Sequence, residues 1–273
     1  MKHSLLLAGA AVTLSLAPAV RADHNWNGYH WASTVSPFTL TLINSTTSEW
    51  DPFVTQAVAD WSLSSRLTLV ESEGDTSSKT RRSCKGGSGG MRICNLAYGY
   101  NGWLGVAGIS VDGYGHITSA YTKLNDSYFS PGYANGYYDT FEWRQSVTCQ
   151  ELGHDLGLDH QDEVFDNLPL FTCMDYQDPP YPYPNAHDYE ELDSLYSSTD
   201  SYDSYAGGDS GGGGDSGGCN APQGKGCNKA GVEDHPGWGI SVSRRGDLEV
   251  FLRIDSRGLR HYTFVRWIKE HRH

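Results

Sequence analysis

The segment from Gln150 to His160 constrains the fold of this chain more than any other. It reads Gln-Glu-Leu-Gly-His-Asp-Leu-Gly-Leu-Asp-His. Residues 141–153 are predicted to form a helix, on which residues four apart share a face and lie about 6 Å apart along the axis. Gln150 and His154 are spaced in this way. Gly157 can end the helix because glycine adopts a left-handed backbone without strain, and the turn brings His160 back towards the same point.

Side chains that converge in this way can hold a metal ion. Zinc is commonly bound by histidine nitrogen, and three protein ligands plus one water form a catalytic zinc site. Glu151 occupies the position of the glutamate in H-E-x-x-H segments, where it is the general base. We therefore predict that His154 and His160 are metal ligands, that the cofactor is Zn²⁺, and that Glu151 is catalytic.

Gln150 stands where the H-E-x-x-H pattern has its first histidine. A neutral amide oxygen is a poorer zinc donor than His, Cys or a carboxylate, although the side chain is long enough to reach the ion. Two interpretations stay open from the residues alone. Either Gln150 completes the ligand set weakly or through a water, or it does not bind the metal at all.

The wider pattern resembles the extended signature of metzincin zinc peptidases. Every signature position after the first agrees, and Cys173-Met174-Asp175-Tyr176 follows 13 residues after His160, where metzincins have their Met-turn. The likeness extends over roughly residues 36–197. It is greatest to secreted matrixin-like metallopeptidases of bacteria and fungi, including the short strand-rich tail.

This resemblance implies a fold, an activity and roles for several residues. Met174 is expected to form an apolar floor beneath the metal, Gly157 to have a structural role, and Tyr176 to stabilise a developing oxyanion. The expected function is a secreted zinc endopeptidase that acts on protein or peptide substrates, with Glu151 as general base. The resemblance also implies that a peptide substrate lies antiparallel to the edge strand of the predicted hairpin. The alternative is a weak or inactive pseudoenzyme that binds a partner, because Gln150 replaces a ligand histidine.

Composition divides the chain into four parts. Residues 1–22 combine a basic start, a short apolar run and small residues before a cleavage point, which is typical of a signal peptide and predicts an extracellular protein. Residues 198–218 are almost entirely Ser, Asp, Gly and Tyr, so we predict a flexible linker. Between them lies the predicted metallopeptidase domain, residues 23–197. Residues 219–273 are predicted to be a small all-β module, and a third possibility is that this module binds or adheres.

Hydrophobic periodicity favours an α+β fold of the zincin-like type, with a mixed twisted sheet, an active-site helix and a Met-turn. Strands are predicted at residues 38–43, 67–70 and from 93 onward, a hairpin at 105–111 and 116–124, and helices at 50–61, 141–153 and 185–196. Three further strands are predicted in the tail, at residues 239–244, 248–254 and 260–267.

The six cysteines fall in three close pairs, which favours local disulfides in an oxidising compartment. Six cysteines allow 15 connectivities, so nearness is the only guide to pairing. No C-x2-C spacing occurs, which argues against a zinc finger. The predicted pairs are Cys84 with Cys94, Cys149 with Cys173, and Cys219 with Cys227.

The net charge of −13 is concentrated in the larger part of the chain. Residues 23–218 hold 8 Lys and Arg against 27 Asp and Glu, whereas residues 219–273 hold 10 against 6. An acidic domain repels nucleic acid, so we expect no nucleic-acid partner, no membrane insertion, and a monomer. Asp162 and Glu163 are interpreted as surface acids rather than supports of His160. The remaining histidines singled out are expected to be structural: His24, His116 and His187.

Overall fold

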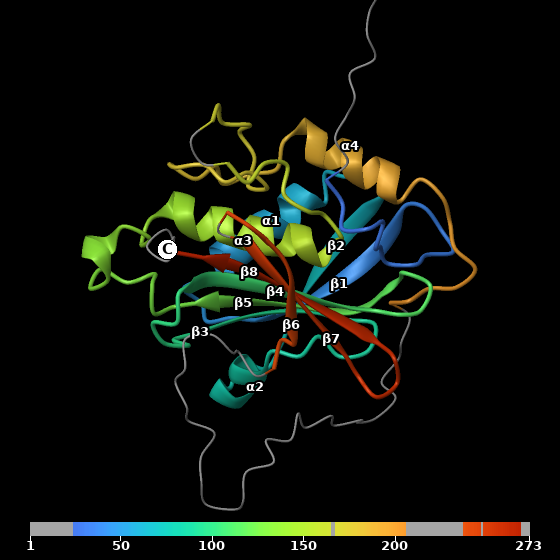
Figure 1. Ribbon diagram of the computed structural model, residues 1–273, viewed down its shortest axis with the longest axis horizontal. Helices are drawn as coiled ribbons and strands as arrows, with labels where there is room; N and C mark the ends of the chain where they lie inside the picture. Colours follow the sequence, from blue (N-terminus) through green and yellow to red (C-terminus); the bar gives the residue numbers. More distant parts are fainter. Residues whose placement is uncertain (1–23, 165–166, 206–236, 247, 269–273) are drawn as a thin grey trace, which may run out of the picture.

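A single mixed sheet of eight strands forms the centre of the molecule in the computed structural model (Figure 1). The structure describes residues 24–164, 167–205, 237–246 and 248–268. The predicted signal peptide, most of the predicted linker, and Cys219 with Cys227 lie outside these residues. The strand order is β2-β1-β3-β5-β4-β8-β7-β6. The predicted α+β class is confirmed.

The first five strands form the parallel half of the sheet and its central hairpin. β1, β2, β3 and β5 run parallel, and β4 pairs antiparallel with β5, as predicted for the hairpin. In β1 the side chains alternate between buried and exposed, so one face of this strand packs on the core. Their bounds are β1 Phe38–Ser45, β2 Leu67–Glu73, β3 Met91–Leu96, β4 Trp103–Val111 and β5 Ile117–Asn125.

The three tail strands form as predicted, but they do not make a separate module. They are β6 (Ile240–Arg245), β7 (Leu248–Ile254) and β8 (Arg260–Trp267). β8 pairs antiparallel with β4 along its whole length, so the tail continues the main sheet. The prediction of a separate module is therefore wrong for the tail strands that the structure describes. The physical reason is that β4 offers β8 a complete ladder of backbone hydrogen bonds.

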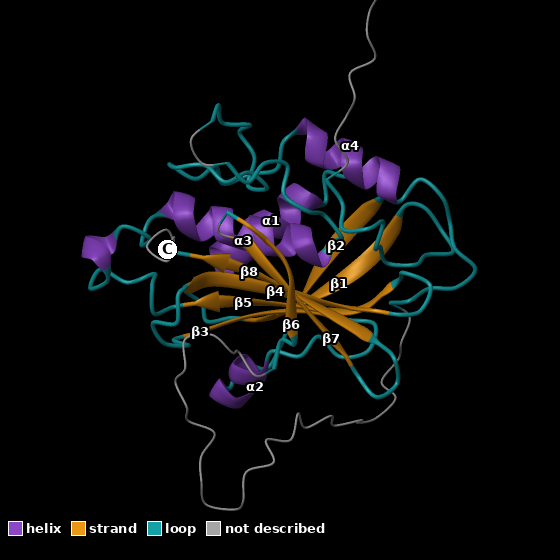
Figure 2. Ribbon diagram, viewed as in Figure 1, coloured by secondary structure: helices purple, strands orange, loops and turns teal. Residues whose placement is uncertain are grey.

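The helices lie on both sides of this sheet (Figure 2). α1 (Asp51–Trp61) and α3 (Phe141–Asp155) pack together on one side, and α2 (Ser78–Ser83) lies on the other. α3 crosses β4 and β5. A single turn, η1 (Ala134–Gly136), precedes α3, and α4 (Ala186–Leu195) follows much later. In the part of the chain that the structure describes, the helices are too short or too polar to cross a membrane.

β4, the strand beneath α3, is buried on both of its faces. Every residue of β4 is buried. On one face it packs against α3, and on the other Trp103 and Val106 form a second apolar cluster with Val265 of β8. The strand that supports α3 is thus covered from both sides.

Two predicted disulfides are present. Cys84 is bonded to Cys94, and Cys149 is bonded to Cys173 with their Cα atoms 6.0 Å apart. The second bond joins α3 to the segment that carries Met174. It therefore fixes two parts of the chain that the metzincin resemblance places at one site.

The ends of α3 are determined by local chemistry. Thr140 caps the first turn by accepting a hydrogen bond from the backbone N–H of Trp143 at 3.2 Å. Just beyond the last turn, Gly157 has φ +95°, and a Cβ there would lie 2.1 Å from the carbonyl oxygen of Tyr29. Only glycine satisfies both conditions, so the predicted structural role of Gly157 agrees with its geometry.

Replacing Gly157 with alanine should strongly destabilise the protein. The change imposes a strained backbone and a clash with the Tyr29 carbonyl, so the free energy of unfolding should fall by at least about 2 kcal/mol. The measurement is urea denaturation followed by tryptophan fluorescence. Gly113→Ala is the matched control, because Gly113 lacks a positive φ and has open space around it. Equal stability of the two variants would contradict the argument.

Candidate metal centre

Gln150, His154 and His160 converge at the end of α3. The Nε2 atoms of His154 and His160 lie 3.2 Å apart, and the amide nitrogen of Gln150 touches His160 Nε2. All three residues are buried. The sequence therefore predicted correctly which side chains meet, and the turn at Gly157 is what returns His160 to the helix.

Hydrogen bonds determine which imidazole nitrogen of His154 can bind a cation. Its Nδ1 lies 2.9 Å from the carbonyl oxygen of Leu158, which can only accept, so Nδ1 carries the proton and Nε2 is bare. Burial lowers the pKa of His154 to about 4, and burial also lowers the pKa of His160 well below its usual value. Both rings are thus neutral near pH 7, which is the form that binds metals.

Glu151 lies on the same helix and faces β4. Its carboxylate packs so tightly on Gly105 that a Cβ there would lie 2.5 Å from Glu151 Oε1. Burial raises the pKa of Glu151 to about 8, and the charge of Arg266 opposes this rise. A carboxyl group with a pKa near neutrality is suited to accept and return a proton.

Met174 and Tyr176 lie beside the two histidines. Met174 is buried and packs on Gly153, where a Cβ would lie 2.6 Å from the Met174 sulfur. The Tyr176 ring packs on the His160 ring with centroids 4.5 Å apart. The loop is held in place because Gln161 N donates to the carbonyl oxygen of Met174 at 2.8 Å. Both residues therefore pack against the segments that carry the two histidines.

Arg266 has no motif that marks it in the sequence, but it is buried beside Gln150. Its Nη1 donates to Gln150 Oε1, and its guanidinium lies 5.5 Å from the centre of the Tyr176 ring. Since guanidinium only donates, this contact identifies the Gln150 oxygen as the atom facing Arg266. The one atom of Gln150 that could bind a metal is therefore engaged by a cation of the chain itself.

β8 brings Arg266 to the site and closes the edge of β4. Gly105 pairs with Arg266, and Ala107 pairs with Phe264, whose ring stacks on His154 with centroids 4.9 Å apart. We expected this edge of the hairpin to be free for a peptide, but in the structure β8 occupies it. No local sequence signal marks the pairing, because β4 and β8 lie far apart in the chain.

The chemistry of the histidines fits zinc. Two ligands of a tetrahedral zinc ion with Zn–N bonds of about 2.0–2.1 Å lie about 3.3–3.4 Å apart. The Nε2 atoms, at 3.2 Å, match this spacing. The bare Nε2 of His154 faces the Nε2 of His160, so an ion bound there would contact both rings. His154 and His160 would hold the ion, with Gln150 available only after release from Arg266.

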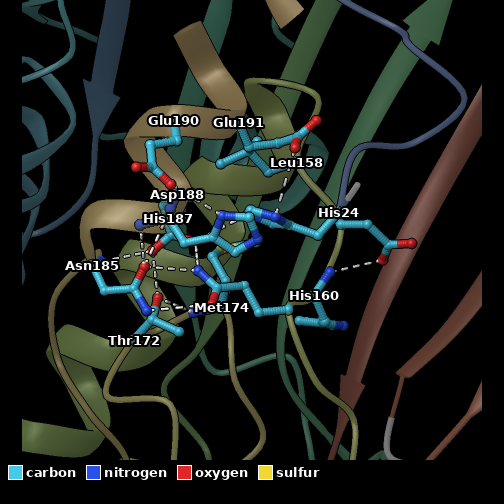
Figure 3. A network of polar contacts seen from close by, with 12 residues as sticks. His24, Leu158, His160, Thr172, Met174, Asn185, His187, Asp188, Glu190 and Glu191 are labelled. Atoms are coloured by element: carbon cyan, nitrogen blue, oxygen red, sulfur yellow. Dashed lines mark hydrogen bonds and ion pairs between the residues drawn. The ribbon is translucent and has the colours of Figure 1, made fainter. Parts of the chain in front are cut away.

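A buried polar network supports the loop that carries His160 (Figure 3). At its centre is Asp188 of α4, which accepts hydrogen bonds from Gln161 Nε2 at 2.7 Å and the backbone N–H of Asn185 at 2.7 Å. Thr172 Oγ1 donates to the same carboxylate, and His24 Nε2 lies 3.2 Å from it. The network joins the N-terminal segment, the His160 loop and the Met174 segment.

The other polar residues singled out in the sequence differ in the contacts that they make. Asp162 accepts from the backbone N–H of Val164 at 2.8 Å and therefore stabilises its own loop. Glu163 Oε1 lies 4.0 Å from His160 Nδ1, too far for a hydrogen bond. His24 is part of the buried network, as a structural histidine would be. His116, in contrast, meets partners that are distant in sequence.

No protein-family model matches this chain, and no curated protein matches it either.

Replacing Asp188 with alanine should destabilise the protein by about 3–5 kcal/mol, because the donors it satisfies would stay buried without an acceptor. Thermal and urea unfolding measure the effect. Asp193→Ala is the control on the same helix, since Asp193 is exposed and pairs with Arg66 at the surface. That variant should unfold like the parent. Similar decreases in the free energy of unfolding in both variants would show that the buried network contributes no more to stability than a surface ion pair.

Proposed function

We propose that this chain is a zinc-dependent endopeptidase of the metzincin type. The observation that carries the proposal is the convergence of His154 and His160, with bare or neutral nitrogens at zinc-ligand spacing, on and just after the helix that carries Glu151. Met174 and Tyr176 add support, because Met174 packs on Gly153 of α3 and the Tyr176 ring packs on the His160 ring. The disulfide between Cys149 and Cys173 makes the support rigid, as a preorganised site needs.

In this proposal each residue has a definite part in peptide-bond hydrolysis. Bound zinc would acidify a water molecule and polarise the substrate carbonyl. Glu151 would accept a proton from the attacking water and return it to the leaving amine. The hydroxyl of Tyr176 would donate a hydrogen bond to the substrate carbonyl oxygen as negative charge develops on it. His154 and His160 hold the ion, and the hydrogen bond to Leu158 orients the first of these rings.

A second candidate function is that of a pseudoenzyme on the same scaffold. The observation that favours it is the contact between Arg266 and Gln150, which directs the only possible ligand atom of Gln150 away from the histidines. With two ligands, zinc affinity and turnover would both be low. The chain would then act as a binding protein.

Glu151→Gln should reduce cleavage of an unfolded protein substrate by about 10²–10⁴-fold, because the variant can no longer accept a proton. Its zinc content should equal that of the parent, since Glu151 is not a ligand. The readouts are the cleavage rate and the zinc per chain measured by atomic absorption.

Glu142→Gln is the matched control, because Glu142 lies exposed on the same helix. Equal cleavage by Glu151→Gln and the parent would sink the proposal. The pseudoenzyme is favoured instead if the parent holds little zinc and cleaves nothing, while Gln150→His restores both.

A further inference from the structure

A second cluster of metal-ligand side chains lies away from α3. His30 precedes β1, His116 lies at the β4–β5 turn, and Asp200 follows α4. One ligand atom from each lies within 4.8 Å of the other two. The three come from segments far apart in sequence, which explains why spacing gave no signal for His116.

The backbone holds these segments together independently of the side chains. His30 and His116 form a β-bridge, and the N–H of Ile117 donates to the carbonyl oxygen of His30 at 2.7 Å. Asp200 N donates to the carbonyl oxygen of Ser33 at 2.7 Å, and Ser33 N donates to Asp200 Oδ2 at 2.9 Å. The cluster is therefore built into the fold.

Hydrogen bonds on the outer side of each ring determine its tautomer. His30 Nδ1 lies 2.8 Å from the carbonyl oxygen of Gly28, which can only accept. Tyr202 donates its hydroxyl proton to Asp112, so it accepts from His116 Nδ1 at 2.7 Å. In both neutral rings Nδ1 carries the proton and Nε2 is bare.

Both bare nitrogens face the same carboxylate. His30 Nε2 lies 3.5 Å from Asp200 Oδ2, and His116 Nε2 lies 3.4 Å from Asp200 Oδ1. Lone pairs facing a carboxylate repel unless a cation lies between them. The separations are close to the roughly 3.3–3.4 Å between ligands of a tetrahedral zinc ion.

We propose that His30, His116 and Asp200 form a second metal site that binds zinc. Two imidazoles and one carboxylate favour zinc over calcium or magnesium, and water completes the tetrahedron. The ion ties the N-terminal segment to the β4–β5 turn and to the segment after α4. Its role is structural, because it joins three segments that are far apart in the chain.

The test uses the full chain with His154→Ala and His160→Ala, which removes the first ligand set. Calorimetric titration with zinc should find one ion per chain, and bound zinc should raise Tm. Adding His116→Asn should abolish both effects, whereas adding His187→Asn, a partly exposed histidine outside the cluster, should change neither. If the double variant fails to fold, the parent replaces it, and His116→Asn should lower its zinc stoichiometry by one.

Two results overturn the proposal. One is zinc binding that His116→Asn leaves unchanged. The other is no zinc binding, with a rise in Tm below about pH 6 that depends on His116, which would show that protons rather than a metal balance Asp200.

A different observation, the burial of Arg266, carries a second inference, which rests on the proposed function. β8 pairs antiparallel with β4, the geometry expected of a bound peptide, and Arg266 engages the Gln150 oxygen. The guanidinium also lies 5.4 Å from the centre of the Trp143 ring, so it is held on several sides. A buried guanidinium and a divalent cation repel each other strongly at this range.

We infer that β8 is an internal occupant of the substrate position, and that Arg266 and zinc exclude each other. Full activity then requires β8 to leave β4. Arg266→Met removes the charge but keeps much of the side-chain volume, and it should raise zinc affinity on the order of tenfold. Arg266→Lys should retain the low affinity of the parent, since its charge persists. Arg253→Met, an exposed cation on β7, is the control and should match the parent.

Isothermal titration with zinc and the rate of peptide cleavage are the two readouts. Circular dichroism and Tm establish that each variant is folded, and Arg266→Lys serves if Arg266→Met is not. Equal zinc affinity of parent, Arg266→Met and Arg266→Lys overturns this inference and leaves the proposed peptidase intact. Absence of zinc from all folded variants overturns both.

Discussion

The structure depends on how a polar helix is buried. Every residue of α3 from Trp143 to Asp155 is buried, although many of these side chains are polar. Burying a polar group without a partner costs more than most single contacts return. Some of these polar side chains take partners from outside the helix. Arg144 pairs with Asp139 at 2.7 Å, and Asp155 accepts from Thr122 of β5 at 2.9 Å. The sheet and the loops around α3 are arranged to supply such partners.

The same constraint explains why the tail belongs to the main sheet. The oxygen of Gln150 is buried and needs a donor, because a buried polar atom without a partner is costly. Arg266 of β8 supplies that donor, so pairing of the tail with β4 satisfies the helix. Zinc bound by His154 and His160 would bring a second cation close to Arg266, and two buried cations at this range repel each other.

Local features of this fold were predictable and long-range ones were not. The helix bounds, the turn at Gly157 and the bond between Cys149 and Cys173 follow from spacing and backbone chemistry over a few residues. The pairing of β4 with β8 has no local signature, because hydrogen-bond ladders form between strands of many sequences. The linker composition of residues 198–218 suggested independence, yet flexibility in a connection says nothing about where its ends dock. Arg266 and Asp200 were not predicted as site residues, because each reaches its site through contacts between segments that are distant in the sequence.

The N-terminal segment connects the two proposed metal sites. His24 accepts a hydrogen bond from the N–H of Asp159, next to His160, at 2.6 Å. A few residues later, Trp31 Nε1 donates to the carbonyl oxygen of Asp155 at 2.9 Å, and His30 lies between these two anchors. A zinc ion that fixes His30 would therefore stiffen the segment that supports the turn carrying His160.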